Sequence, residues 1–273
     1  MKKFFLSSYI LWMIIFTVIP IILVGYYAFT QTENGIIFFT LNNFERVFKM
    51  VYIKVFIRSL NLALICTAIC FFISYPVAYI MADKNFHFSS TLLFLFLVPM
   101  WMNMLLRTYA WLTILENNGL INSLLKILGL QKINLLYRKE TIILGAVYNF
   151  LPFMILPIYN SLEKINHNTI EAAQDLGANT FTIFIKIIFP LSLPGVFSGV
   201  TMVFIPAVTT FIVPNLLGGG KFMLVGNLIE QQFLRLADWH FGSAISLILI
   251  GVVFLVGIIF SSIDINNEGG NLF

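Results

Sequence analysis

The sequence is poor in charged residues. Asp, Glu, Lys and Arg make up 10% of its 273 residues, whereas an ordinary soluble domain has roughly 25%. Hydrophobic residues account for 59% of the chain, which excludes a soluble domain and indicates an integral membrane protein surrounded by a lipid bilayer. The net charge of +4 is dispersed, with no cluster of Lys and Arg that would bind a phosphate backbone, so we expect no nucleic-acid partner.

Cysteine is nearly absent. Cys66 and Cys70 lie four residues apart in an apolar run, on the same face of a helix. A metal site there would need further ligands, and the surrounding sequence offers none. We therefore interpret both cysteines as small buried residues and expect no metal site, disulfide or redox role.

The sequence also lacks the side-chain combinations of an intramembrane enzyme. Its histidines, His87, His167 and His240, fall in three separate loops, and neither H-E-x-x-H nor G-x-S-x-G occurs. An ion-coupled secondary transporter is a second alternative, but it would be expected to bury carboxylates, and the uncharged runs contain none. Both classes are therefore disfavoured.

Long uncharged runs are what the sequence has in abundance. Six of them reach the length of about 20 residues that a helix needs to cross a hydrocarbon core of about 30 Å. The runs are continuous rather than alternating in polarity, so we expect helices rather than barrel strands. The predicted fold is all-α, a single transmembrane domain over residues 1–273, with spans at approximately 10–29, 58–81, 90–113, 141–161, 191–216 and 243–263.

The first run and the prolines need separate comment. The first run exceeds the 7–15 residues of a signal-peptide core. We therefore expect that it is not cleaved and is retained as the first transmembrane span. Membrane helices tolerate proline where neighbours satisfy the freed carbonyls, so kinked helices are expected. The prolines within the spans are Pro20, Pro76, Pro99, Pro152, Pro157, Pro206 and Pro214.

The distribution of basic residues bears on orientation. Lys2 and Lys3 precede the first span, and no Lys or Arg follows it until Arg46, which favours a cytoplasmic N-terminus and, with six spans, both termini in the cytoplasm. This choice leaves only Lys2, Lys3, Lys84, Lys164 and Lys186 inside, against the positive-inside expectation. Two loops of mixed polarity, 116–140 and 218–242, would then lie outside, and the first suits a helix at the interface or packed over the bundle.

Between the fourth and fifth spans, residues 163–190 are too polar to cross a membrane. Asn168 is placed to cap a helix, with Glu171 reaching back to it in a capping box. Gly177 supplies a stop, and Asn179 or Thr180 starts a second helix that ends near Pro190. The segment predicts a helix, a glycine turn and a second helix on the membrane surface.

Residues 171–190 carry the pattern E-A-A-x₃-G-x₉-I-x-F-P. This resembles the EAA loop of permease subunits of binding-protein-dependent ABC importers, in which Leu takes the place of Phe189. The resemblance implies the type I permease fold and a cytoplasmic coupling helix that sits in a cleft of a separate ATPase. The residues it assigns to ATPase coupling are Glu171, Ala172, Ala173, Asp175, Gly177 and Ala178.

The chain has no nucleotide site of its own. In the stretch 215–222, NLLGGGKF, Asn replaces the first Gly of a Walker A motif and Phe replaces the Mg²⁺-binding Ser or Thr. We therefore expect no cofactor in this chain, with ATP and Mg²⁺ bound by the partner ATPase. The family resemblance implies that this ATPase is a homodimer, that a second, paralogous permease completes the pathway, and that an extracellular or periplasmic protein binds the substrate.

Further stretches narrow the family. The sequences RTYAW (107–111), NLLY (134–137), FLPFMILPIY (150–159), FIPAVTTFIVPNLLGG (204–219) and ADWHFGSA (237–244) together resemble the spermidine/putrescine importer permeases, most closely the first of their two permease subunits. This implies a polyamine permease of a bacterial inner membrane, without ranking spermidine against putrescine. The alternative is a related importer of phosphonate, opine, iron or thiamine.

A path for a flexible polycation should offer aromatic faces and oxygen dipoles, with few fixed positive charges. Suitable residues in the third and fifth spans are Trp101, Asn103, Tyr109, Phe204, Thr209, Thr210 and Phe211. Arg107 stands at the outer end of the third span, where snorkelling or pairing with Glu116 is the ordinary interpretation. The alternative is that Arg107 forms part of a gate or contacts the binding protein. The positive charge of Arg107 argues against contact with a polycation.

Overall fold

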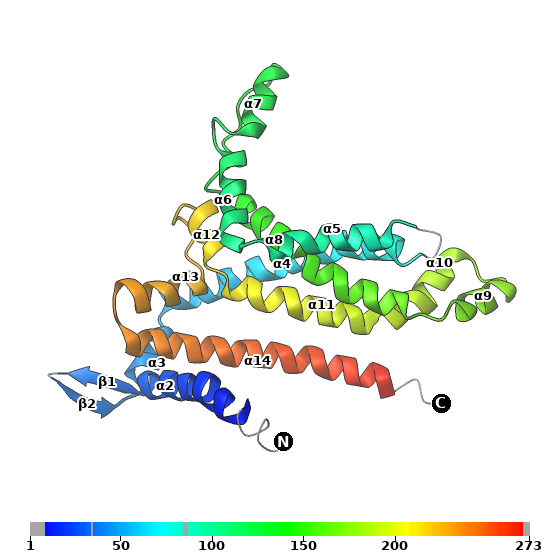
Figure 1. The fold of residues 1–273 in the computed structure, drawn as a ribbon. Coiled ribbons are helices and arrows are strands. Elements are labelled where there is room, and N and C mark those ends of the chain that lie inside the picture. Colours follow the sequence, from blue (N-terminus) through cyan, green and yellow to red (C-terminus); the bar gives the residue numbers. More distant parts are fainter. Residues whose placement is uncertain (1–8, 34, 84–86, 270–273) are drawn as a thin grey trace.

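The structure is a computed structural model that describes residues 9–33, 35–83 and 87–269, with residues 259–269 described by their backbone alone. Three long helices form the core, and each packs on the other two: α4 (Met50–Met81), α8 (Lys139–Glu163) and α11 (Phe189–Thr209). Around them lie α5 (Ser89–Trp101) on α8, α14 (Trp239–Gly269) beside α11, and α2 (Ile19–Ala28) on α14 (Figure 1).

Small residues let the core helices approach closely. A Cβ atom added at Gly195 of α11 would lie 2.5 Å from the carbonyl oxygen of Pro157 in α8, and one added at Gly199 would lie 2.7 Å from Sδ of Met154. In a bilayer, where lipid is as apolar as leucine, such close van der Waals packing is a main source of helix association. Replacing these glycines would therefore separate α11 from α8.

Cys66 and Cys70 lie on the core-facing side of α4. Both are fully buried and free, and Cys70 Sγ lies 3.9 Å from the carbonyl oxygen of Val147 in α8. Their interpretation as small buried residues is confirmed.

Six apolar spans are present if a bent pair is counted as one. Among the described residues, five helices are long and apolar enough to cross a membrane: 9–28, α4, α8, 180–209 and 239–258. The sixth is the pair Ser89–Trp101 and Met104–Ile127, bent by 96°. The predicted span 90–113 is therefore broken at Met102 and Asn103, and α5, with 13 residues and about 20 Å of length, is too short to cross alone.

The fifth span is broken as well, toward its C-terminal end. After α11 ends at Thr209, Thr210 is extended, and the short helix α12 (Ile212–Leu217) follows. α12 packs on α6 (Met104–Leu115), the helix that follows the first break. The two breaks thus lie in neighbouring parts of the fold.

Two prolines are accommodated by wide helical turns. The π-helical segments Ile14–Val18 and Phe184–Ile188 each contain the residue four positions before a proline, Pro20 or Pro190. A proline ring clashes with that carbonyl in a regular α-helix, and a π turn relieves the clash. The helix therefore continues from Thr180 through Pro190 to Thr209, and the predicted end near Pro190 is wrong.

A small element that the sequence did not predict follows the first helix. Strands β1 (Thr30–Glu33) and β2 (Ile36–Phe39) pair antiparallel, with Thr30 opposite Phe39, and α3 (Asn42–Val47) follows. Asn43 Nδ2 donates to the carbonyl oxygens of Ala28 (3.1 Å) and Thr30 (2.9 Å), which fixes the hairpin against the helix end.

The same region is tied to the start of α14. Arg46 forms an ion pair with Asp238 at 3.1 Å and stacks on the ring of Phe241, with 4.0 Å between the guanidinium carbon and the ring centre. His240 Nδ1 lies 3.1 Å from the carbonyl oxygen of Tyr27. Polar contacts thus join the first and last spans at this end.

Figure 1 shows the two ends of the bundle. α9 (His167–Asp175) lies at one end, which we call the α9 end, and the hairpin and α13 (Val225–Glu230) lie at the other, the hairpin end. The first helix runs toward the hairpin end, and α14 runs from the hairpin end back toward the α9 end. This arrangement agrees with an even number of spans. Lys2, Lys3 and Lys84, on which the predicted orientation depends, lie outside the described residues.

Candidate functional site

The α9 helix begins at a different cap from the one predicted. Asn166, not Asn168, is the N-cap, and its side chain accepts a hydrogen bond from the Asn168 backbone N–H at 3.0 Å. Glu171 does not reach back to the cap, because it contacts Nδ1 of His167 at 3.0 Å, one turn before it. Both asparagines suit a cap, and the extended backbone of Asn166 decides between them.

The C-terminal end of α9 confirms the predicted stop. Gly177 has φ +81°, a left-handed conformation that favours glycine. Its N–H donates to Gln174 O at 2.8 Å, and the Ala178 N–H donates to Ala173 O at 3.0 Å. These two bonds form a Schellman motif, which satisfies carbonyls at the helix end and turns the chain sharply.

The second helix of the segment joins the fifth span directly. Of the two predicted caps, Asn179 and Thr180, the structure selects Asn179, which caps α10 (Thr180–Ile183) by accepting from the Thr182 N–H at 2.8 Å. From there the helix runs without interruption to Thr209. A movement at the glycine turn would therefore be transmitted to the core helices through one continuous helix.

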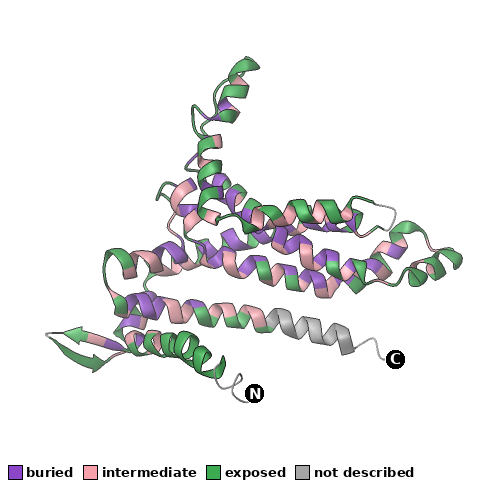
Figure 2. Cartoon of the chain, viewed as in Figure 1, coloured by how far each residue is buried: buried purple, intermediate pink, exposed green. Residues whose placement is uncertain are grey.

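The surface of this segment is open. No residue of α9 is buried, and the apolar side chains of Leu176 and Phe181 are 88% and 72% exposed (Figure 2). Ile170, Ala173 and Ala178 are half-buried against the core cluster and anchor the segment. Of the predicted coupling residues, those on the open side are Glu171, Ala172, Asp175 and Gly177.

The predicted path residues gather mainly at the two helix breaks. Trp101 is the last residue of α5, and Asn103 caps α6 by accepting from the Leu105 N–H at 2.8 Å. At the second break, Thr209 ends α11, Thr210 is buried and Phe211 precedes α12. The two remaining residues differ: Tyr109 is exposed on α6, and Phe204 is enclosed in the core cluster, with 5% of its surface exposed.

Side chains that the sequence did not single out complete the second break. Asn227 Nδ2 donates to Phe211 O (2.9 Å) and to Asn215 Oδ1 (2.7 Å), and Asn215 Nδ2 donates to Glu230 Oε2 (2.7 Å). Backbone groups at a broken helix are costly in a membrane unless they are paired. The Phe211 carbonyl accepts from the Asn215 N–H at 3.1 Å and from Asn227 as a second donor, so Asn227 ties α13 to the start of α12. In the sequence, the Gly-Asn dipeptide at 226–227, in an otherwise apolar stretch, is the signal that could have identified Asn227.

Gly226 explains how α13 reaches this break. A Cβ atom at Gly226 would lie 2.3 Å from the Thr209 carbonyl oxygen and 2.8 Å from that of Thr210. Only glycine permits this approach, so α13 presses its backbone against the carbonyls of the break.

Arg107 neither snorkels to water nor pairs with Glu116, the two arrangements expected from the sequence. Only 7% of its surface is exposed, so it does not snorkel to water, and Glu116 is exposed and forms no ion pair with it. Its Nε and Nη1 atoms are buried and have no hydrogen-bond partner among the described residues. One helical turn later, Trp111 packs edge-to-face on Tyr148 of α8, with ring centres 5.3 Å apart.

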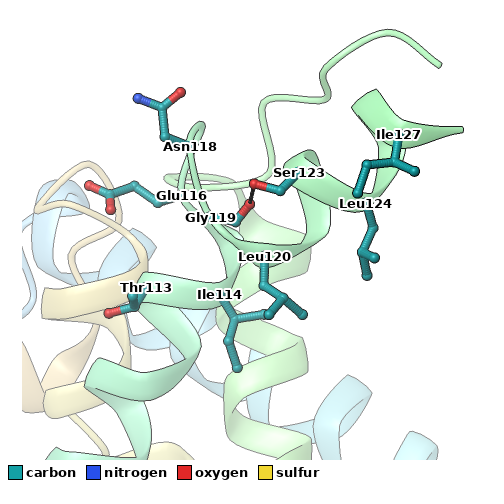
Figure 3. A pocket seen from close by; sticks show the side chains of 9 residues that line it. All are labelled: Thr113, Ile114, Glu116, Asn118, Gly119, Leu120, Ser123, Leu124 and Ile127. Atoms are coloured by element: carbon teal, nitrogen blue, oxygen red, sulfur yellow. Dashed lines mark hydrogen bonds between the residues drawn. The ribbon is translucent and has the colours of Figure 1, made fainter. Parts of the chain in front are cut away.

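A groove of about 460 Å³ lies at the elbow between α6 and α7 (Leu120–Ile127) (Figure 3). Its lining residues are Thr113, Ile114, Glu116, Asn118, Gly119, Leu120, Ser123, Leu124 and Ile127. The predicted loop helix is thus present as α7, but it projects away from the bundle instead of packing over it (Figure 1).

Comparison with known proteins gives one family and close relatives. Residues 74–264 match the family described as "Binding-protein-dependent transport system inner membrane component". The spermidine/putrescine transport system permease protein PotB of Escherichia coli is 38% identical over 253 residues, covering 90% of this chain and 92% of that protein. PotB of Haemophilus influenzae is 40% identical over 242 residues, covering 86% and 84%.

Solved structures give the same architecture. A chain of a bacterial ABC transporter that imports the acidic polysaccharide alginate superposes with a TM-score of 0.81 at 17% identity, covering 97% of this chain and 95% of that one. A chain of the methionine ABC transporter MetNI, in an inward-facing conformation, gives 0.59 at 16% identity, covering 82% and 98%. At these identities the likeness concerns the fold.

Proposed function

Because the chain belongs to the inner membrane components of binding-protein-dependent transport systems, the permease subunits of ABC importers, we propose that it imports polyamines, spermidine and putrescine among them. It is a multi-pass subunit of the inner membrane and a transport protein, not an enzyme. The polyamine assignment is supported by two permeases named for that substrate, at 38% and 40% identity over most of each chain.

The observation that carries the coupling role is the exposed α9 segment joined to a continuous helix. We assign Glu171, Ala172, Ala173, Asp175, Gly177 and Ala178 to the contact with a homodimeric ATPase, which holds ATP and Mg²⁺. Small residues allow close approach of the ATPase surface, and the exposed Leu176 and Phe181 supply the apolar contact that such an interface needs. Movement of the ATPase then tilts residues 180–209 and alternates access to the path.

This role sets the orientation. We assign the α9 end to the cytoplasm, and both termini to the same side, which is supported by the first helix running toward the hairpin end and α14 running away from it (Figure 1). The hairpin end faces the outside, where an extracellular or periplasmic binding protein delivers the substrate. A second, paralogous permease forms the other half of the path.

The helix breaks suit weak binding of a polycation. Backbone carbonyls and aromatic faces at Trp101, Asn103, Tyr109, Thr209, Thr210 and Phe211 attract ammonium groups. The part-buried carboxylate at the second break, that of Glu230, is engaged by Asn215 Nδ2 at 2.7 Å. Phe204 would join the path when α11 separates from its neighbours.

The test is uptake of radiolabelled spermidine and putrescine in cells with and without the gene, in a strain that has no other polyamine route. We expect uptake that depends on the gene and that resists competition by phosphonate. Undiminished uptake in the deletion strain would remove the polyamine assignment and leave a related importer, for phosphonate, opine, iron or thiamine, as the alternative.

A further inference from the structure

Arg107 presents an incomplete ionic site. The side chain is 93% buried by this chain's own atoms, and two of its three guanidinium nitrogens, Nε and Nη1, have no acceptor among the described residues. A buried charge without a partner costs several kcal/mol, which a paired and hydrogen-bonded charge recovers in part. An oxygen acceptor from outside this chain would complete the site.

The direction from which such an acceptor approaches is set by α6. Arg107 stands at the margin of the buried face of the helix, because Leu106 beside it, Asn103 one turn earlier and Ala110 one turn later are all exposed. A molecule lying on this exposed side of α6 therefore comes within reach of the guanidinium group.

The surface around Arg107 is a built structure. We call residues 104–133 the α6–α7 arm. Asn122, 1% exposed, ties it together: its Nδ2 donates to Glu116 O (3.1 Å) and Ile133 O (3.0 Å), and its Oδ1 accepts from the Ile133 N–H (2.9 Å). Beyond the arm, the Tyr137 N–H donates to Leu217 O of α12 at 3.0 Å. The projecting shape is thus fixed by buried hydrogen bonds.

The arm carries an uncovered apolar face. Leu120, Leu124 and Ile127 recur at helical spacing on α7 and are 63%, 52% and 80% exposed. Figure 3 shows Leu120, Leu124 and Ile114 on the same side of the elbow, away from Glu116 and Asn118. The face continues onto α6 at Leu106, which is 62% exposed.

Charge and position together select the occupant. A cationic solute offers the guanidinium no acceptor. Lipid acyl chains would cover the leucines, but the only acceptor that a phospholipid offers is at its headgroup, so lipid alone is the outcome that crosslinking without a protein adduct would indicate. The arm extends sideways from the bundle, after a bend of 96°, into the region where the spans of a neighbouring membrane protein would stand (Figure 1). A protein subunit in the same membrane supplies both an apolar surface and a carboxylate.

We propose that the second permease subunit covers the exposed face of the α6–α7 arm and places a carboxylate on Arg107. This inference rests on the proposed function, which requires a second permease. It assigns Arg107 to holding the two permeases together near the outer ends of their helix breaks, so that the breaks of the two subunits face one another.

The direct test is photo-crosslinking in the assembled importer, expressed with its second permease, ATPase and binding protein. A benzoylphenylalanine residue replaces Ala110 or Leu124 in the arm, and Phe72, 73% exposed on α4, serves as the control position. We expect adducts with the second permease from positions 110 and 124 and none from position 72. Adducts with the binding protein alone, or no protein adduct, would overturn the proposal.

The charge is tested separately. Because breaking a buried ion pair costs about 3–5 kcal/mol, R107Q should lower the second permease recovered with a tagged copy of this chain by at least about tenfold. K126Q, which removes an exposed charge from α7, is the matched control and should leave recovery unchanged. Recovery unaffected by R107Q, at equal membrane levels, would contradict the ionic contact.

A charge exchange keeps the test valid if R107Q folds poorly. R107E should lose the second permease, and changing one acidic residue of that subunit to Arg should restore it; a complete scan of its acidic residues without restoration counts against the proposal. Uptake measurements separate the two ideas. Polyamine uptake without any adduct between the permeases would remove this inference alone, whereas an adduct without polyamine uptake would remove the substrate assignment alone.

Discussion

The two ends of this molecule are stabilised in different ways. At the α9 end, nine helical residues are capped by local hydrogen bonds, none is buried, and a glycine turn sets their direction. At the hairpin end, the break in the fifth span is held by Gly226 and Asn227, which belong to a later segment and contact the residues from Thr209 to Asn215. The exposed α9 segment is thus shaped by local sequence, whereas the break in the fifth span depends on contacts with another segment of the chain.

The largest expected effect comes from the glycine turn. G177E places a bulky charge where φ is +81°, with no atom within 4 Å of an added Cβ, so the fold bears only the conformational cost of about 1–2 kcal/mol. Since the side chain would meet the ATPase, we expect normal membrane levels but loss of ATPase association and of uptake. Co-purification of the ATPase and transport assays measure both.

Gly35 provides a matched control for this change. It has the same φ of +81° and open space around an added Cβ, but it lies in the hairpin at the other end. G35E should bear the same conformational cost and keep the ATPase. Equal losses in the two variants would show that strain, rather than position in the coupling segment, causes the defect.

A smaller effect is expected from the apolar contact surface. L176D charges a side chain that is 88% exposed, so the isolated chain should be unaffected. If Leu176 contributes about 2 kcal/mol to the interface, its loss weakens ATPase binding roughly thirtyfold. L234D, at a residue 79% exposed toward the hairpin end, is the control. The measurement is the affinity of each variant for the ATPase in detergent. A similar weakening in both variants would argue against a specific ATPase contact at Leu176.

At the hairpin end the expected cost is in stability. N227A leaves Asn215 Oδ1 without a donor and removes one of the two hydrogen bonds to the Phe211 carbonyl, which still accepts from the Asn215 N–H. The free energy of unfolding should fall by about 1–3 kcal/mol. N117A, at an exposed asparagine, should change it little. Thermal unfolding of the purified protein compares them. Equal stability of the two variants would mean that the break does not depend on this network.

The smallest effect is expected at the ion pair between the first and last spans. Both side chains of Arg46 and Asp238 are about one third exposed, and such pairs contribute about 1 kcal/mol or less. R46Q also loses the stacking on Phe241, so a slight decrease in melting temperature is expected, larger than that of K54Q. A large decrease would mean that the hairpin region, and not the core, limits stability.

The same contrast explains how much the sequence could predict. The apolar runs, the stop at Gly177 and the cap at Asn179 were predicted because composition and capping act over a few residues. The cap at Asn166 was missed by two positions, since two asparagines compete within one turn. The type I permease fold is confirmed by the family match and by the structural superposition.

The breaks could not be predicted from local sequence. Uncharged residues continue through Thr210, so the local sequence does not mark the break. Gly226 and Asn227, more than a dozen residues later, pack against the break and hydrogen-bond to it. At Pro190 the error was the reverse: a helix end was predicted from the proline, but a π turn lets the helix continue. Tertiary partners decide both cases.

The first helix has a consequence for how the protein is made. Residues 9–28 form a helix of mean hydropathy 2.3, with no buried residue in its most apolar window, and its main helical neighbour is α14, which begins at Trp239. A ribosome adding about 5–20 residues per second reaches α14 roughly 10–40 s after the first helix has emerged. During that interval the helix must remain alone in lipid. A helix that is apolar on every side is suited to that wait, because no polar face of it needs a protein partner before its neighbour is synthesised.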